Sequence, residues 1–505
     1  MAFKILAFFS LLLFWAVGNS SAIPQVSHQS VFWHVTDIHV DQNYSRTGNP
    51  LDLCHDDNTD HPDNGLYGNF LCDSPLYLVN ATINSMKIIE PHPDFVLWTG
   101  DNLPHTSGEN PEWNLIFEAI KNVTELLKVS FPGIPVFPSI GNHDTFPPNM
   151  LIPNSTTDTV YKNFLEKGGW EDFLDENAKS TFIKGGYYSQ IIRPALRIIS
   201  LNTILWYEPN TFTEGLIDPV DQFQWFEDVL KNSSTSHEKV YIIGHVPPGY
   251  YNRVRYPEQS KPTYHPQYLA TYLQLLKRYA DIIIGQLFGH LHIDMFQLFQ
   301  CDSGVFLSSS LLASSVTPWY HDSGDNSSVP VNPSVRLMYY SHQDGQLKDY
   351  DQFFLNLTKL NSINKTEEST SVYELLYKFT DFYKVPDLST NSLVNVYEKL
   401  KENPDLYEAF YKFSTAGKET YPCDSHCKTA QMCSIACSSH DEYYYCMTNV
   451  NASVYVCNNA ASSPTNYYII LYVGIALVFT LVIFLGFYFW YGRNRHVRYE
   501  QFSSF

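Results

Sequence analysis

Between residues 31 and 357, short apolar runs alternate with polar loops and with longer stretches of helical period. Short apolar runs that end at turn residues predict β-strands. The residues Gln343-Asp344-Gly345 between the last two runs predict a hairpin turn. We expect strands at Val31–Thr36, Phe95–Thr99, Val136–Ile140, Tyr187–Ile192, Leu196–Asn202, Val240–Gly244, Ile282–Phe288, Met295–Cys301, Val305–Ser310, Arg336–Ser341 and Leu347–Leu355.

Four stretches between these strands carry apolar residues at helical spacing, at Pro75–Ile89, Trp113–Leu127, Val220–Leu230 and Tyr264–Tyr279. Strands that alternate with helices predict a layered α/β (α+β) domain and not a helix bundle. We assign this first domain to residues 23–360.

The character of the chain changes after residue 360. Ser369–Tyr383, Leu393–Lys401 and Leu406–Ser414 are predicted helices, and six of the nine cysteines follow between Cys423 and Cys457. The pattern predicts a small helical, cysteine-rich subdomain over 361–457. Disulfides are the favoured interpretation, and a zinc knuckle is the weaker one in an oxidising compartment. We also expect Cys54 to pair with Cys72, and closing a loop of that size contributes about 3 kcal/mol in the chain-entropy model.

The first 22 residues have the pattern of a secretory signal peptide. Lys4 precedes the apolar run Ile5–Val17, and the small residues Ser20-Ser21-Ala22 follow it. An N-terminal membrane anchor is the alternative, but the apolar run is too short to span a bilayer comfortably.

Near the C-terminus, Tyr467–Tyr491 contains no charged residue and is long enough to cross a bilayer core of about 30 Å. Three arginines follow it, so residues 492–505 are expected to be a cytoplasmic tail and 458–466 a stalk. A glycolipid-anchor signal is the rival interpretation, but such a signal ends in its apolar segment. Tyr499–Phe502 in the tail resembles a tyrosine-based sorting motif that would bind a sorting adaptor. We therefore expect a type I single-pass membrane protein.

Composition narrows the class of protein. The 505 residues carry a formal net charge of −20, which disfavours a nucleic-acid polymer as partner. Aromatic residues make up 15% of the chain, enough to build a large core. The sequons fit a glycosylated lumenal or extracellular side, at Asn43, Asn80, Asn122, Asn154, Asn232, Asn326, Asn356, Asn364 and Asn451.

The candidate chemistry lies in five segments that each follow a predicted strand. They provide nitrogen and oxygen donors and no thiolate: Asp37, His39, Asp101, Asn142, His245, His290 and His292. Taken singly, a Gly-Asp or Gly-His pair is usually a turn or a hydrogen-bonded histidine. Seven donors together are too many for one tetrahedral zinc and suit two metal ions that share a carboxylate. Such a pair can clamp both oxygens of a phosphoryl transfer.

In this order, the segments resemble the calcineurin-like metallophosphoesterases. Further matches to the acid sphingomyelinase branch, specifically its sphingomyelinase-like phosphodiesterases, are Phe32–His39, Leu71-Cys72-Asp73-Ser74-Pro75, Trp98–Asp101 and Arg197–Asn202. The resemblance covers roughly residues 30–457. It implies an αββα sandwich with a helical C-terminal subdomain and two Zn²⁺ ions.

The resemblance also assigns roles. It puts Asp37, His39 and His292 at the first metal and Asn142, His245 and His290 at the second, with Asp101 as the bridge. His105 and His143 match catalytic positions, and hydrolysis is expected through a metal-bridging hydroxide. The disulfides Cys423–Cys427 and Cys433–Cys446 are implied, which leaves Cys437 and Cys457 to pair and Cys301 odd. Asp144 is either a supporting group behind the ligands or a turn cap.

The expected function is that of a zinc-dependent phosphodiesterase acting on nucleotides or choline-phosphate conjugates. No saposin-like cysteine set precedes Val31, which disfavours ready extraction of lipid. Sphingomyelin in a membrane remains the alternative substrate, and a catalytically weak receptor or adaptor is the alternative of another class. Tyr250, Tyr251 and Tyr256 either line a base-stacking pocket or pack in the core, and we favour packing.

Overall fold

The structure is a computed structural model that describes residues 30–55, 63–105, 112–153, 158–251, 261–300, 304–320, 329–363, 371–418 and 422–448. The predicted signal peptide, stalk, membrane span, tail and sorting motif lie outside these residues, as do Tyr256, Cys301 and Cys457. Within them, no helix combines the length and hydropathy needed to cross a membrane.

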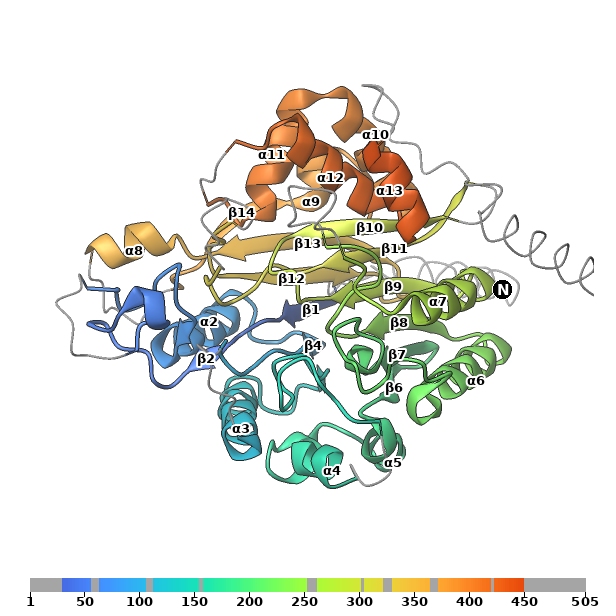
Figure 1. Cartoon of the computed structure of the whole chain (residues 1–505), viewed down its shortest axis with the longest axis horizontal. Helices are drawn as coiled ribbons and strands as arrows, with labels where there is room; N and C mark the ends of the chain where they lie inside the picture. The colour runs from blue at the N-terminus through green and yellow to red at the C-terminus, as the bar shows by residue number, and fades with distance from the viewer. Residues whose placement is uncertain are drawn as a thin grey trace, which may run out of the picture.

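Two six-stranded mixed sheets form the centre of the fold (Figure 1). The first has the order β14-β13-β12-β1-β4-β5 and the second β10-β11-β9-β8-β7-β6. The strands of the first sheet are β1 Ser30–Val35, β4 Phe95–Trp98, β5 Val136–Pro138, β12 Ser334–Tyr340, β13 Leu347–Phe354 and β14 Glu374–Lys378. Those of the second are β6 Tyr188–Arg193, β7 Leu196–Ser200, β8 Lys239–Ile243, β9 Ile283–Phe288, β10 Met295–Gln300 and β11 Phe306–Leu312. A further pair joins β2 Val40–Asp41 to β3 Ser74–Pro75.

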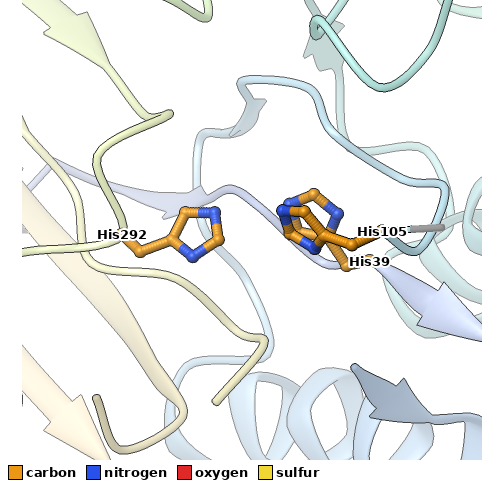
Figure 2. A group of neighbouring side chains, drawn as sticks. All are labelled: His39, His105 and His292. Carbon is orange, nitrogen blue, oxygen red and sulfur yellow. The ribbon is translucent and has the colours of Figure 1, made fainter. Parts of the chain in front are cut away.

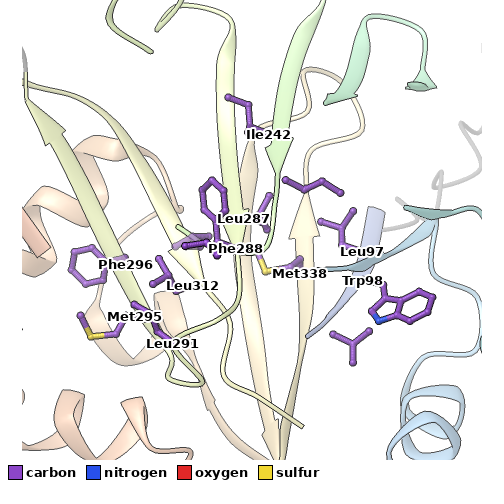
Figure 3. Packing of buried hydrophobic residues seen from close by; sticks show 14 of the residues in the cluster. Leu97, Trp98, Ile242, Leu287, Phe288, Leu291, Met295, Phe296, Leu312 and Met338 are labelled. Carbon is purple, nitrogen blue, oxygen red and sulfur yellow. The ribbon is translucent and has the colours of Figure 1, made fainter. Parts of the chain in front are cut away.

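Helices lie along the outer sides of both sheets. The helix α2 (Leu76–Ile89) contacts β12 and the neighbouring α3 (Trp113–Ser130), while α6 (Gln222–Thr235) contacts β8 and α7 (Pro266–Arg278) contacts β11. The inner faces of the sheets meet in one core, where the rings of Phe32 on β1 and Tyr241 on β8 are 6.0 Å apart. Figure 3 shows this packing from Leu97 and Trp98 of β4 to Leu287 and Phe288 of β9. The expected layered α/β class is confirmed.

The short helices α4 (Asp158–Glu166) and α5 (Glu176–Gly185) connect β5 to β6 and were not expected from the sequence. Asp175 caps α5 by accepting a hydrogen bond from the Ala178 amide, and Gly186 ends it in a left-handed conformation. Both signals are local, so α5 was open to prediction.

The C-terminal helices gather over β10, β11, β13 and β14 at one end of the molecule (Figure 1). They are α9 Phe379–Tyr383, α10 Thr390–Glu402, α11 Pro404–Ser414, α12 Ser425–Ala436 and α13 His440–Thr448, and α8 Leu357–Ile363 precedes them. The helix α10 buries Leu393, Val396, Tyr397 and Leu400, which recur at the spacing of one helical face.

The predicted helix over Ser369–Tyr383 is wrong for its first part. Residues Glu374–Lys378 form β14, which pairs antiparallel with β13 at the edge of the first sheet. A nonlocal partner therefore overrides the local pattern. The hairpin predicted between β12 and β13 is confirmed by their antiparallel pairing.

Three disulfides follow the expectations: Cys54–Cys72, Cys423–Cys427 and Cys433–Cys446. Cys437 is also disulfide-bonded, and its partner lies outside the described residues. Its predicted pairing with Cys457 stays a prediction.

Candidate metal and catalytic site

The predicted donors lie where parallel strands of the two sheets end. Asp37 and His39 follow β1, Asp101 follows β4 and Asn142 follows β5, and these strands are parallel neighbours in the first sheet. His245 follows β8, and His290 and His292 follow β9, its parallel neighbour in the second sheet. Carboxyl ends of parallel neighbours meet at one edge of a sheet, and the two edges converge here.

The loops are joined to one another by backbone hydrogen bonds. The amides of Asp37 and His39 donate to the carbonyls of Gly100 and Asp101 over 3.0 and 3.1 Å. The Gly289 amide donates to the His245 carbonyl over 3.0 Å. The loops also approach closely, since a Cβ on Gly289 would lie 2.0 Å from Thr36 Oγ1. Glycine is therefore required by space at this position.

Five of the seven donors have left-handed backbone conformations. The φ angles are 50° at Asp37, 43° at His39, 57° at Asp101, 70° at His290 and 57° at His292. Residues other than glycine pay about 1–3 kcal/mol each for such strain, which persists where surrounding contacts enforce it and clusters at functional sites.

Asp144 provides part of that enforcement. Its carboxylate accepts hydrogen bonds from the amides of Gly141, Asp101 and Asn102, over 2.9, 3.0 and 2.8 Å. It thus ties the loop after β4 to the loop after β5. Asp144 therefore fills both predicted roles: it caps a turn, and it supports the loops that carry the donors.

All seven predicted donors come together. The side chains of Asp37, His39 and Asp101 offer ligand atoms within 4.8 Å of one another, and so do those of Asp101, His245 and His290. Asp101 Oδ2 lies 3.5 Å from His39 Nε2 and 3.1 Å from His245 Nε2. His292 Nε2 lies 3.3 Å from Asp37 Oδ1, and His245 Nε2 lies 2.9 Å from Asn142 Oδ1.

Two of the histidines are held by backbone carbonyls. His39 Nδ1 donates to the Leu103 carbonyl and His245 Nδ1 donates to the Thr99 carbonyl, each over 2.7 Å. A carbonyl only accepts, so the proton sits on Nδ1 and Nε2 faces the site. His39 Nε2 is buried and has no hydrogen-bond partner among the described residues. A buried lone pair without a donor fits a metal cation.

The electrostatics also fit a cation. Burial acts to raise the pKa of Asp101, but His245 and then His143 lower it well below its usual value, so the carboxylate is ionised. Burial, followed by the charge of His105, lowers the pKa of His39 well below its usual value and keeps that imidazole neutral. The ionised Asp101 and the neutral His39 are the forms that bind a divalent metal. Burial acts to lower the pKa of His245, but the charge of Asp101 raises it to about 9, so this imidazole must release a proton to bind a metal.

The two predicted catalytic histidines lie beside these donors. The ring of His105 is stacked between His39 at 4.3 Å and Trp319 at 3.7 Å, and the ring of His143 is 4.3 Å from His105. Figure 2 shows His292 facing the stacked rings of His39 and His105. The ligand atoms of these three histidines also lie within 4.8 Å of one another. Burial, followed by His105, lowers the pKa of His143 to about 4.

The groups that hold His105 have no role predicted from the sequence. Buried Asp73 accepts from the His105 amide over 2.6 Å and lies 3.1 Å from His105 Nδ1, and Thr317 donates to it over 2.9 Å. Burial raises the pKa of Asp73 to about 7. The disulfide at the adjacent Cys72 was the available signal that this short loop is fixed. Thr317 and Trp319 gave no local signal.

The three tyrosines after His245 differ in their surroundings. Tyr250 is 1% exposed and stacks on Tyr443 of α13 at 4.8 Å, which confirms packing for that residue. The Tyr251 hydroxyl lies 2.8 Å from His290 Nε2. Tyr256 lies outside the described residues.

Two family models match the chain. The model for calcineurin-like phosphoesterases matches residues 30–294, and the model for the acid sphingomyelin phosphodiesterase C-terminal region matches residues 307–453. The fold and the first match define a calcineurin-like phosphoesterase. A fold of this family implies a divalent metal, and the aspartate and histidine clusters are able to bind one.

Relatives specify the branch. Acid sphingomyelinase-like phosphodiesterase 3b of Homo sapiens is 33% identical over 448 residues, which cover 88% of this chain and 94% of the relative. Cyclic GMP-AMP phosphodiesterase SMPDL3A of Rattus norvegicus is 36% identical over 412 residues, covering 80% and 88%. Sphingomyelinase phosphodiesterase C of Dictyostelium discoideum is 33% identical over 416 residues, covering 80% and 89%. The chain belongs to the acid sphingomyelinase-like phosphodiesterases and is a phosphoric diester hydrolase.

Proposed function

We propose that the seven donors bind two zinc ions, with Asp37, His39 and His292 at the first, Asn142, His245 and His290 at the second, and Asp101 between them. The observation that carries this assignment is the position of Asp101 Oδ2. This oxygen is within 3.5 Å of a histidine nitrogen from each group. A carboxylate that contacts both groups is what two ions sharing a ligand require.

When bound, a pair of divalent ions supplies Lewis acidity and an activated water for attack on phosphorus. The proposed roles of the protein's own groups follow from position. His105, held by Asp73, donates to the phosphoryl oxygens and stabilises their charge. His143 donates a proton to the leaving oxygen. Its pKa of about 4 rises when an anionic phosphate lies beside it, because an opposite charge favours the imidazolium.

The proposed substrates are nucleotides and other soluble phosphodiesters or phosphoanhydrides, including choline-phosphate conjugates. One relative is named for hydrolysis of a cyclic dinucleotide, which supports this class. Sphingomyelin is the second candidate, supported by the name of the relative from Dictyostelium discoideum. An adaptor with a weak or inactive metal site is the candidate of another class.

A comparison of substrates separates these candidates. Purified full-length protein is assayed with ATP, with cyclic GMP-AMP and with sphingomyelin in detergent and in liposomes, at pH 5 and pH 7. The proposal predicts turnover of the nucleotides and none of liposomal sphingomyelin. Faster turnover of liposomal sphingomyelin would favour a lipid phosphodiesterase. Two bound zinc ions without turnover of any of the four would favour the adaptor.

For location, the proposal is a lumenal or extracellular catalytic region anchored by Tyr467–Tyr491. The disulfides of the described residues support an oxidising compartment. Extraction of membranes with alkaline carbonate tests the anchor. Retention in the membrane pellet is expected, and release of intact protein into the supernatant would contradict it.

A further inference from the structure

His290 is held differently from His39 and His245. Those two histidines donate from Nδ1 to backbone carbonyls and turn Nε2 toward the site. In His290 it is Nε2 that is engaged, 2.8 Å from the Tyr251 hydroxyl. His290 nevertheless belongs to a group whose ligand atoms lie within 4.8 Å of one another, with Asp101 and His245. With Nε2 engaged, the nitrogen left for this group is Nδ1.

A second tyrosine supports the first. The Tyr251 hydroxyl also hydrogen-bonds the buried Tyr207 hydroxyl, and Tyr207 lies edge-on to the His290 ring with centroids 5.2 Å apart. Tyr207 is fixed in turn, because it forms a backbone bridge with Tyr264, and the neighbouring Glu208 amide donates to the Thr263 carbonyl over 2.9 Å. The pair therefore belongs to an ordered wall built from the loops after β7 and β8.

The backbone of His290 is fixed from the opposite side. Its amide donates to both oxygens of Asp37, over 3.1 and 2.9 Å, and its φ is 70°. His290 is thus held at its backbone amide by Asp37, a donor of the proposed first metal position, and at its ring nitrogen Nε2 by Tyr251. A neutral imidazole has one N–H and one lone pair, so the partner at one nitrogen decides which nitrogen binds a metal.

We infer that Tyr251, supported by Tyr207, is a positioning residue whose hydroxyl oxygen accepts a hydrogen bond from the Nε2–H group of His290, which leaves the lone pair of Nδ1 to bind the metal. The Tyr251 hydroxyl in turn donates its hydrogen bond to the Tyr207 hydroxyl oxygen. This inference rests on the proposed two-zinc site and names a determinant of its second position. It makes zinc affinity at one of two positions depend on a side chain that contacts no metal.

The test compares two neighbouring tyrosines in purified full-length protein. Tyr251→Phe removes the hydroxyl that contacts His290. Tyr250→Phe is the matched control, because it also removes a hydroxyl bonded to a histidine, here His440 Nδ1 at 3.1 Å, outside the donor set. Zinc content is measured after competition with graded chelator, and cobalt-substituted protein reports ligand geometry through its visible spectrum.

In Tyr251→Phe, one zinc ion should be lost at a roughly 10- to 100-fold lower chelator strength than in wild type, as for other partners of ligating histidines. The second ion should stay, the cobalt spectrum should change, and excess zinc should restore kcat with KM unchanged. Tyr207→Phe should give a smaller shift in the same direction, and Tyr250→Phe none.

Two results would overturn the inference about Tyr251 and leave the proposed two-zinc site standing. One is Tyr251→Phe with wild-type affinity for both ions and an unchanged cobalt spectrum. The other is a raised KM with unchanged zinc affinity, which would make Tyr251 a substrate contact. A wild-type protein that binds no zinc, or an Asp101→Asn variant that keeps both ions, would instead overturn the proposed two-zinc site and the inference with it.

Discussion

Four histidines of the site form two pairs that differ in the groups to which they are hydrogen-bonded. His39 and His245 are held by backbone carbonyls, while His290 and His105 are held by the side chains of Tyr251 and Asp73. Every residue has a backbone carbonyl, so a hydrogen bond to a carbonyl does not depend on which side chain stands at that position. The first pair is therefore fixed by the fold itself, and the second depends on particular residues far away in the sequence.

This difference predicts two sizes of effect when residues of the site are substituted. Substitutions of the donors should abolish metal binding. Substitutions of Tyr251 or Asp73 should leave the fold and most of the donor set in place and change affinity or turnover by smaller factors. The following predictions test that ranking, from the largest effect to the smallest.

The largest effect is expected at Asp101, the donor that contacts both groups. Asp101→Asn keeps the shape of the side chain but removes the charge between His39 and His245. Both ions should bind weakly, and kcat/KM should fall by about 10³-fold or more, since metals contribute several kcal/mol to such transition states. Elemental analysis measures the metal content, and steady-state kinetics measure kcat/KM. An active variant that retains both ions would remove Asp101 from the bridging position.

His143→Ala should lower kcat by roughly 10²- to 10⁴-fold on a phosphodiester with a poor leaving group, because it removes the proposed proton donor. On a nitrophenyl phosphodiester, whose leaving group needs no proton, the loss should be much smaller. Zinc content should not change. Equal losses on both substrates would exclude the general-acid role.

Asp73→Asn should lower kcat by about 10- to 100-fold, because it weakens the contact that orients His105. Asp41→Asn is the matched control, since Asp41 also contacts a histidine, His55 Nε2 at 2.7 Å, which is neither a predicted donor nor a predicted catalytic residue. The control should keep wild-type turnover. If both variants lose activity equally, the Asp73 effect is one of folding and not of His105.

The smallest expected effect is on stability, through the same Asp41–His55 pair. The hydrogen bond to Asp41 raises the pKa of His55 in the folded state. The contribution is therefore complete below the unfolded pKa of about 6.5 and is lost as pH rises through the higher folded value. After allowance for solvent screening, Asp41→Asn should cost about 0.5–1 kcal/mol more at pH 5 than at pH 9. Denaturant unfolding at the two pH values measures this, and an equal cost at both would contradict it.

The sequence was informative about the donors because they follow strands. Each donor stands next to a buried apolar run, so its place at a sheet edge can be predicted from local pattern, as for Asp37 after β1 and His245 after β8. The groups that hold the histidines were not predicted, because the contact is made only in the folded chain. Asp73 is 32 residues from His105, and Tyr251 is 39 residues from His290.

The same limit applies to the fold. Apart from β14, the strands of the two central sheets were predicted within a few residues. The strand β14 was mistaken for a helix, since its pairing with β13 has no signature in its own residues. The burial of Tyr250 against α13 likewise joins segments that are 193 residues apart in numbering, Tyr250 and Tyr443.

The central claim is that one carboxylate lies between two metal ions. Anomalous diffraction at the zinc absorption edge from crystals of the zinc-loaded protein tests it most directly. The account predicts two peaks about 3.5–4 Å apart, one on each side of Asp101. A single peak, or two peaks of which one is remote from Asp101, would contradict it.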